Sequence, residues 1–181
     1  MNRGIKSSSG DIIGILNSDD IFYDDNVISE IVKNFQKYTY KIIFGDLVYF
    51  SCKKPHKIVR RYASKGFRPW KLRFGWMPPH PSTFIHKSIY IDHGLYSTKF
   101  HTGSDYELFV RLLMKKKIPF MYINKIFVKM RMGGATTSGF KSLIRTSTEM
   151  VYALKYNGFY TNYFLIYMRL PVKLFETFKF F

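Results

Sequence analysis

The sequence has little cysteine and no long apolar run. Cys52 is the only cysteine among 181 residues, so an internal disulfide is excluded, and no CxxC or clustered Cys/His pattern is present to hold a structural zinc ion. No stretch reaches roughly 18 uncharged apolar residues, the length needed to span a bilayer. The opening MNRGIKSSSG also lacks the apolar run of a signal peptide. We therefore expect one domain in a reducing compartment, cytoplasmic and without a spanning helix.

Acidic residues are also scarce. The chain has 12 Asp and Glu against 29 Lys and Arg, a formal net charge of +17, which predicts a negatively charged partner or surface. Aromatic residues make up 19% of the chain, which excludes a disordered basic tail. The patterns GxxxxGK[ST], GxGxxG and GxSxG are absent, so P-loop, dinucleotide-binding and serine-hydrolase functions have no support.

The few acids are concentrated near the start of the chain. Residues 1–30 carry a net charge of −4 and the other 151 residues +21, which indicates a site that needs carboxylates. Asp19 and Asp20 follow the apolar run 11–16 (DIIGIL), which predicts a strand buried on both faces of a parallel sheet. Carboxylates at that end of a strand can hold Mg²⁺ or Mn²⁺ against a diphosphate. The alternative is a solvated helix-capping turn.

The rest of the pattern predicts an α/β sheet followed by a helical end. Apolar residues at helical spacing predict a helix over 25–38, capped by Asp24 or Asp25. Alternation and apolar runs predict strands over 41–50 and 120–130. Further expected elements are a basic loop or hairpin over 51–75, an extended proline-rich path over 76–84, and helices over 103–114 and 142–156.

Three further residues could carry chemistry. Asp105 stands at the predicted start of a helix, where the dipole favours a carboxylate that accepts a proton, although it could equally be an N-cap. His80 is held between two prolines and could bind hydroxyls or phosphate, or be a structural histidine. Arg131, before Gly133 and Gly134, could bind an anion in a flexible loop.

Six blocks in order strongly resemble the family 2 glycosyltransferases, especially the small bacterial enzymes of polysaccharide and O-antigen assembly. They extend from about residue 2 to residue 138, and six blocks in the right order are more specific than any one of them. The blocks are NRGIKSSSGDIIGILNSDD (2–20), FGD (44–46), PHPSTF (79–84), GLY (94–96), SDYEL (104–108) and MRMGG (130–134).

The resemblance implies a GT-A fold, a mainly parallel sheet flanked by helices, and transfer of a sugar from a nucleotide-diphosphate donor with inversion. Ser18, Asp19 and Asp20 stand where the family keeps its DxD-type motif, with Ser18 replacing the first acid of the strict pattern. Asp20 would ligate Mn²⁺ or Mg²⁺, and Asp19 would lie beside the ribose or sugar. Asp105 stands at the position of the general base. By resemblance His80 would line the acceptor side and Arg131 a diphosphate lid.

Members of the family usually have a nucleotide-binding strand, helix and strand before the block that opens this sequence. By that comparison about 70 residues are missing, and we expect an unpaired sheet edge that a partner chain would cover. The alternative function is therefore a non-catalytic remnant or subunit of such an enzyme.

The chain is predicted to divide into a partial GT-A catalytic domain over 1–140 and a helical segment over 141–181. Aromatic and basic residues after Gly158 suit an anionic membrane surface, where a lipid-linked acceptor would be presented; the alternative is an ordinary helix packed on the domain. The expected location is peripheral, at the cytoplasmic face of the inner membrane. The basic run 53–73, with its interleaved aromatics, leaves a nucleic-acid-binding module as a third function, but that function gives no reason for the acidic cluster.

Overall fold

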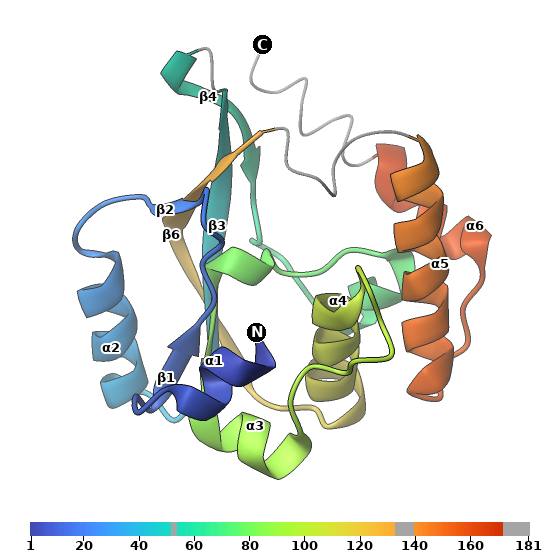
Figure 1. The fold of residues 1–181 in the computed structure, drawn as a ribbon, viewed down its shortest axis with the longest axis horizontal. Coiled ribbons are helices and arrows are strands. Elements are labelled where there is room, and N and C mark those ends of the chain that lie inside the picture. The colour runs from blue at the N-terminus through green and yellow to red at the C-terminus, as the bar shows by residue number, and fades with distance from the viewer. Residues whose placement is uncertain (52–53, 133–139, 172–181) are drawn as a thin grey trace. The chain divides into compact units, whose positions relative to one another are not determined.

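The computed structural model describes residues 1–51, 54–132 and 140–171, which divide between two compact units (Figure 1). Unit 1 consists of Met1–Lys65, Pro78–Leu95 and Ile118–Met132. Unit 2 consists of Gly66–Met77, Tyr96–Lys117 and Gly133–Phe181. The predicted boundary at residue 140 remains a prediction, although two earlier segments share a compact unit with the C-terminal helices.

Unit 1 is built on a six-stranded sheet in the order β1-β5-β3-β6-β2, with β4 paired to β3. Its strands are β1 (Ile12–Gly14), β2 (Ile21–Phe22), β3 (Ile42–Ser51), β4 (Lys54–Tyr62), β5 (Thr83–His86) and β6 (Phe120–Arg131). The expected strands over 41–50 and 120–130 are confirmed, and the expected hairpin is the β3–β4 pair.

The α/β class with flanking helices is confirmed, but the sheet is mixed rather than mainly parallel. Among the described strands only β3 and β6 pair in parallel, and the other four pairings are antiparallel. The predicted strand over 11–16 is reduced to the three residues of β1. Within the described residues it pairs with β5 alone, antiparallel, and just one of its own three residues is buried. Its apolar run looked like that of an inner strand because period and composition do not reveal direction or neighbours.

Helix α2 (Val27–Lys37) covers one face of the sheet, as Figure 1 shows. Its buried Val27 and Ile31 join Ile43, Phe84 and Phe127 in the apolar core of unit 1. The N-cap is Asn26 rather than Asp24 or Asp25, because the Asp24 carboxylate instead accepts the Asn26 N–H at 2.8 Å in a turn before the helix. Two short helices, α1 (Asn2–Ser7) and α3 (Lys87–His93), complete the helices of this unit.

The proline-rich segment is more compact than expected. A 3₁₀ turn, η2 (His80–Ser82), interrupts the extended path before β5. Its backbone is fixed by Ser82, whose buried hydroxyl donates to the carbonyl oxygen of Asp46 on β3 at 3.0 Å. The segment therefore has a defined place against the sheet, as two prolines beside His80 had suggested.

Unit 2 consists of helical elements in its described part. These are η1 (Pro69–Phe74), α4 (Ser104–Phe109), η3 (Val110–Lys115), α5 (Phe140–Tyr156) and α6 (Tyr163–Tyr167). The predicted helix over 103–114 begins at Ser104 as α4 and continues as the π-helical η3, and the predicted helix over 142–156 is α5. In the part of the chain that the structure describes, every helix is too short or too polar to cross a lipid bilayer.

Candidate functional site

Asp19 and Asp20 lie in the short connection between β1 and β2, beyond the end of β1. Asp19 is exposed, whereas Asp20 is only 4% exposed. The Asn17 amide donates to Oδ2 of Asp20 at 2.8 Å, and the Asp20 N–H donates to the Asn17 carbonyl at 3.1 Å. This Asn17–Asp20 turn points one carboxylate inward and leaves the other to solvent.

The environment of Asp20 disfavours its charged form. Burial raises the pKa of the Asp20 carboxyl above its usual range, and the neighbouring charge of Asp19 adds to the rise. The Asn17 side chain and the backbone amides of Arg131 and Asn17 oppose that rise. The Oδ1 atom of Asp20 is enclosed and makes no hydrogen bond. A cation beside this pair would offset both the burial and the repulsion.

The end of β6 lies next to this turn. Because Ile21 and Phe22 of β2 pair with Lys129 and Val128, the backbone of the exposed Arg131 comes beside the Asp20 carboxyl. The structure thus brings the backbone of Arg131 beside the turn that carries Asp19 and Asp20. Their role at a diphosphate site remains a prediction. Gly133 and Gly134, the expected lid loop, lie outside the described residues.

The residues present fit a divalent cation only in part. Asp19 and Asp20 supply carboxylate oxygens, the ligands that Mg²⁺ and Mn²⁺ prefer. Within the described ranges no three His, Cys, Asp or Glu side chains converge into a group that could hold a metal alone. A cation at this position would therefore need further oxygens, such as those of a diphosphate. Only Asp19 offers its carboxylate directly to solvent, because the free Oδ1 of Asp20 is enclosed.

His80 belongs to the same unit and is half-buried in η2. Two hydrogen bonds close the turn that carries it, since the Pro79 carbonyl accepts both the Ser82 N–H at 3.1 Å and the Thr83 hydroxyl at 2.9 Å. The backbone of His80 is therefore fixed. Its predicted place on the acceptor side remains a prediction.

Asp46 is a buried acid that was assigned no role from its sequence position. Its Oδ2 accepts both Nε and Nη2 of Arg61 at 2.8 and 2.5 Å, and its Oδ1 accepts the Ser64 N–H at 2.8 Å. Burial, and then the Asp46 charge, raise the pKa of the nearby Tyr122 to about 12. Asp46 belongs to the FGD block, so a sequence signal for it was present. Its carboxylate binds Arg61 and Ser64 at the end of the β3–β4 hairpin, and its carbonyl oxygen accepts the Ser82 hydroxyl.

Asp105 lies in the first turn of α4, in unit 2. It is half-buried, and its Oδ1 accepts the N–H of the next residue, Tyr106, at 2.7 Å. The N-cap is Gly103, so the capping alternative for Asp105 is wrong in its strict form. Glu107 differs sharply, because it is 1% exposed and bound to Arg111 and Asn157. Of these two acids, only Asp105 is partly open to solvent.

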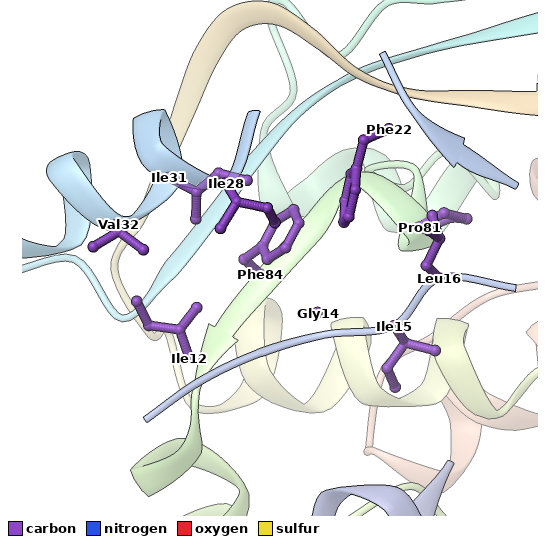
Figure 2. Close-up of a pocket in the computed structure, with 10 residues that line it drawn as sticks. All are labelled: Ile12, Gly14, Ile15, Leu16, Phe22, Ile28, Ile31, Val32, Pro81 and Phe84. Atoms are coloured by element: carbon purple, nitrogen blue, oxygen red, sulfur yellow. The ribbon is translucent and has the colours of Figure 1, made fainter. Parts of the chain in front are cut away.

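A pocket of about 220 Å³ lies beside β1 in unit 1. Figure 2 shows its lining, in which α2 side chains lie near the Phe84 ring and a segment continuing β1 forms the opposite wall. The lining contains no ionisable side chain: Ile12, Gly14, Ile15, Leu16, Phe22, Ile28, Ile31, Val32, Pro81 and Phe84. Such a pocket suits apolar contact and offers no group for acid–base chemistry.

The mixed α/β sheet with flanking helices and acids beyond β1 defines a GT-A-like fold. A crystal structure of residues 1–349 of TarS from S. aureus matches with a TM-score of 0.52 and 6% sequence identity. The match covers 84% of this chain and 43% of the TarS chain, so this chain spans less than half of that protein. At this identity the likeness shows the fold alone.

The sequence comparison identifies the family. The model of glycosyl transferase family 2 matches residues 1–98, which include the turn with Asp19 and Asp20 as well as His80. The chain belongs to glycosyl transferase family 2. No curated protein matches the sequence significantly.

Proposed function

We propose that the protein transfers a sugar from a nucleotide-diphosphate donor to a saccharide acceptor, with inversion, in cell-surface polysaccharide synthesis. The observation that carries the proposal is the pairing of exposed Asp19 with buried Asp20 beside the end of β6, in a chain of this family. A diphosphate leaving group gains negative charge in the transition state. Cationic groups at this position would lower that barrier.

In this proposal Asp19 and Asp20 receive Mn²⁺ or Mg²⁺ together with the donor diphosphate. Asp20 is the predicted metal ligand and Asp19 the predicted neighbour of the ribose or sugar. Exposure supports direct access of a cation to Asp19 first. Titration of Mn²⁺ with a nucleoside diphosphate into Asp19→Asn and Asp20→Asn proteins separates the two roles, because loss of the metal ligand abolishes the metal-dependent part of binding. Equal metal-dependent binding in wild type and both variants would contradict the site.

Asp105 would act as the general base. The first turn of a helix favours negative charge, and the half-buried Asp105 carboxylate there can take the proton of an acceptor hydroxyl as that oxygen attacks the anomeric carbon. His80 is proposed to line the acceptor side and Arg131 to contact the diphosphate.

The experiment is transfer by the purified protein with a panel of nucleotide-diphosphate sugars, with and without Mn²⁺. Release of nucleoside diphosphate measures turnover, and the NMR coupling of the product's anomeric proton reports inversion. Asp105→Asn is expected to lower kcat by about 10²–10⁴-fold, the usual contribution of a general base. The matched control is Asp92→Asn, an exposed acid in unit 1. Equal turnover in both variants would remove Asp105 as base.

A lipid-linked acceptor at an anionic membrane is part of the proposal. Tyr160, just before α6, and Phe164, within it, are 71% and 73% exposed. Arg73 donates to the Tyr160 carbonyl at 3.2 Å, which places a cation there. Aromatic and cationic groups together favour the interface of anionic lipid. Co-sedimentation with vesicles containing phosphatidylglycerol should fall in Phe164→Ser and stay unchanged in Ile91→Ser, whose side chain is 74% exposed in unit 1. Equal binding of both variants would contradict this surface.

A role as a subunit is the second candidate, favoured by β1 and the pocket beside it. Among the described strands β1 pairs on one edge only, and the adjacent pocket is apolar. An extended apolar segment of a partner chain could pair with that edge and enter the pocket. Calorimetry distinguishes the candidates, because a non-catalytic subunit would show no metal-dependent binding of any nucleotide sugar.

A further inference from the structure

Glu149, on α5, accepts hydrogen bonds from three consecutive backbone amides. Its Oε1 accepts the His101 N–H at 3.3 Å, and its Oε2 accepts the N–H groups of Thr102 and Gly103 at 2.8 and 2.6 Å. All of these residues belong to unit 2. An ionised carboxylate is a stronger acceptor for backbone amides than a neutral group, so this contact fixes the three-residue segment 101–103 firmly.

Segment 101–103 leads directly into the helix that carries Asp105. Gly103 is the N-cap of α4, and its carbonyl accepts the Glu107 N–H at 2.9 Å, the first bond of that helix. Glu149 therefore holds the N–H side of Gly103 while α4 holds its carbonyl side. Two residues later the Asp105 side chain is tied to the Tyr106 N–H.

The packing leaves little room for any other arrangement. A Cβ atom on Gly103 would lie 3.0 Å from Cβ and 3.2 Å from Oε2 of Glu149, so the absence of a side chain permits the close approach. Position 103 has a φ of −112°, which any residue can adopt. The glycine is required here by space rather than by backbone conformation.

We propose that Glu149 is a positioning residue, which holds the start of α4 so that the Asp105 carboxylate keeps its place against the acceptor hydroxyl. The inference rests on the proposed function of Asp105. Glu149 lies outside residues 1–98, the part that the family model matches. After Glu107 the sequence contains only two acids, Glu149 and Glu176. A reacting carboxylate must be held within about 0.5 Å of its productive place, so release of segment 101–103 reduces turnover without touching the donor.

The test compares Glu149→Gln with wild type by hydrogen exchange and by kinetics. Glutamine keeps the shape and one accepting oxygen but places an NH₂ group where the second oxygen accepts an amide, so exchange of the 101–103 amides should rise about tenfold. kcat should fall by about 10–100-fold at unchanged KM for the donor, since misplacement of a reacting group by about 1 Å costs on the order of 10² in rate. Glu149→Asp, which retains the charge, should recover part of the loss. Asp92→Asn controls for the lost charge and should alter neither quantity.

Gly103→Ala supplies a second route to the same contact. Its methyl group pushes Glu149 away from the amides, and the predicted result is again faster exchange with lower kcat. Gly4→Ala, where a Cβ meets no atom within 4 Å, is the matched control. Agreement of Gly103→Ala with Glu149→Gln would exclude an effect of charge alone.

Faster exchange with unchanged kcat would overturn the positioning role, and unchanged exchange in Glu149→Gln would overturn the contact itself. A proportional rise in donor KM would also contradict the inference, because it would indicate a role in donor binding. Failure of the proposed function is recognised separately. In that case wild type turns over no donor, while hydrogen exchange still decides whether Glu149 holds segment 101–103.

Discussion

Arg61 and Asp46 form an ion pair in which the two partners differ greatly in exposure. The Asp46 side chain is completely buried, whereas that of Arg61 is 37% exposed on the neighbouring strand β4. Two nitrogens of the guanidinium contact the same carboxylate oxygen. Loss of the pair would therefore cost the buried Asp46 carboxylate more than the Arg61 guanidinium, which can still be solvated by water.

Replacement of Arg61 by leucine should destabilise the fold by about 2 kcal/mol, because it leaves a buried carboxylate without its cationic partner. Loss of a fully buried partner costs about 3–5 kcal/mol, and the exposure of Arg61 reduces that figure. Arg61→Lys should give a smaller loss, since lysine keeps the charge without the two-nitrogen contact. Urea unfolding provides the measurement. The control is Lys125→Met, which breaks the more exposed pair with Glu30 and should cost much less.

Asp20→Asn should stabilise the protein at neutral pH. Burial raises the pKa of Asp20 above its usual value of 3.8, so the folded state holds the proton more tightly than the unfolded state. The ionised acid therefore costs stability above the folded pKa, and that cost is lost as the pH falls through the raised pKa toward 3.8. The Tm advantage of Asp20→Asn should accordingly be largest near pH 7 and shrink toward pH 4. A constant difference across that range would contradict the raised pKa.

Substitution of the two acids in α4 should affect stability and turnover differently. Glu107→Gln leaves the Arg111 guanidinium, 16% exposed, without its counter-charge and should destabilise the protein by about 2–3 kcal/mol. Asp105→Asn keeps an oxygen that can accept the Tyr106 N–H, so its stability should change by less than about 0.5 kcal/mol while turnover falls. Chemical denaturation and donor turnover on both variants check the pair. An equally large stability loss in Asp105→Asn would assign that acid a structural role.

Gly14→Ala should destabilise unit 1 by about 1–3 kcal/mol through overpacking. The added Cβ would overlap the Phe84 ring, which is itself 5% exposed in the core. Gly4→Ala in α1 is the control and should be neutral or stabilising by about 0.5–1 kcal/mol, because the helix loses a flexible residue and the methyl meets nothing within 4 Å. Equal shifts in Tm for both variants would refute the close approach of Gly14 to Phe84.

Local pattern was enough to predict the elements with strong periodicity. The spacing of Val27, Ile31 and Phe35 located α2 to within two residues, and the apolar run after Lys41 located β3. Strand direction was not accessible in this way. The pairing of β1 with β5 depends on a contact between residues about 70 positions apart, and the short apolar run of β1 carries no information on its partner.

In the candidate site, too, the residues were predictable from the sequence whereas their surroundings were not. Asp19, Asp20 and Arg131 were predicted from motif order, and the β2–β6 register brings Arg131 beside Asp20. The difference in burial between the two acids was not predicted, since only the Asn17 turn makes Asp20 buried and leaves Asp19 exposed. Glu149 was missed because its partners are backbone amides, which carry no residue-specific signal. Its one visible mark was an isolated acid in a basic segment.

The three pairings of β3 also set the order in which this sheet can form. Its C-terminal half joins β4 through a short hairpin, and its N-terminal half joins β5 about 40 residues on. Its other edge must wait for β6, since Ile42 pairs with Phe120. The segments η1, α4 and η3 of unit 2 lie between these two residues in the chain. Closing a loop of that length costs conformational entropy before any contact repays it, so we expect β6 to dock late and to limit the folding rate. Since β6 also carries the backbone beside Asp20, the acidic turn acquires its final environment only in that last step.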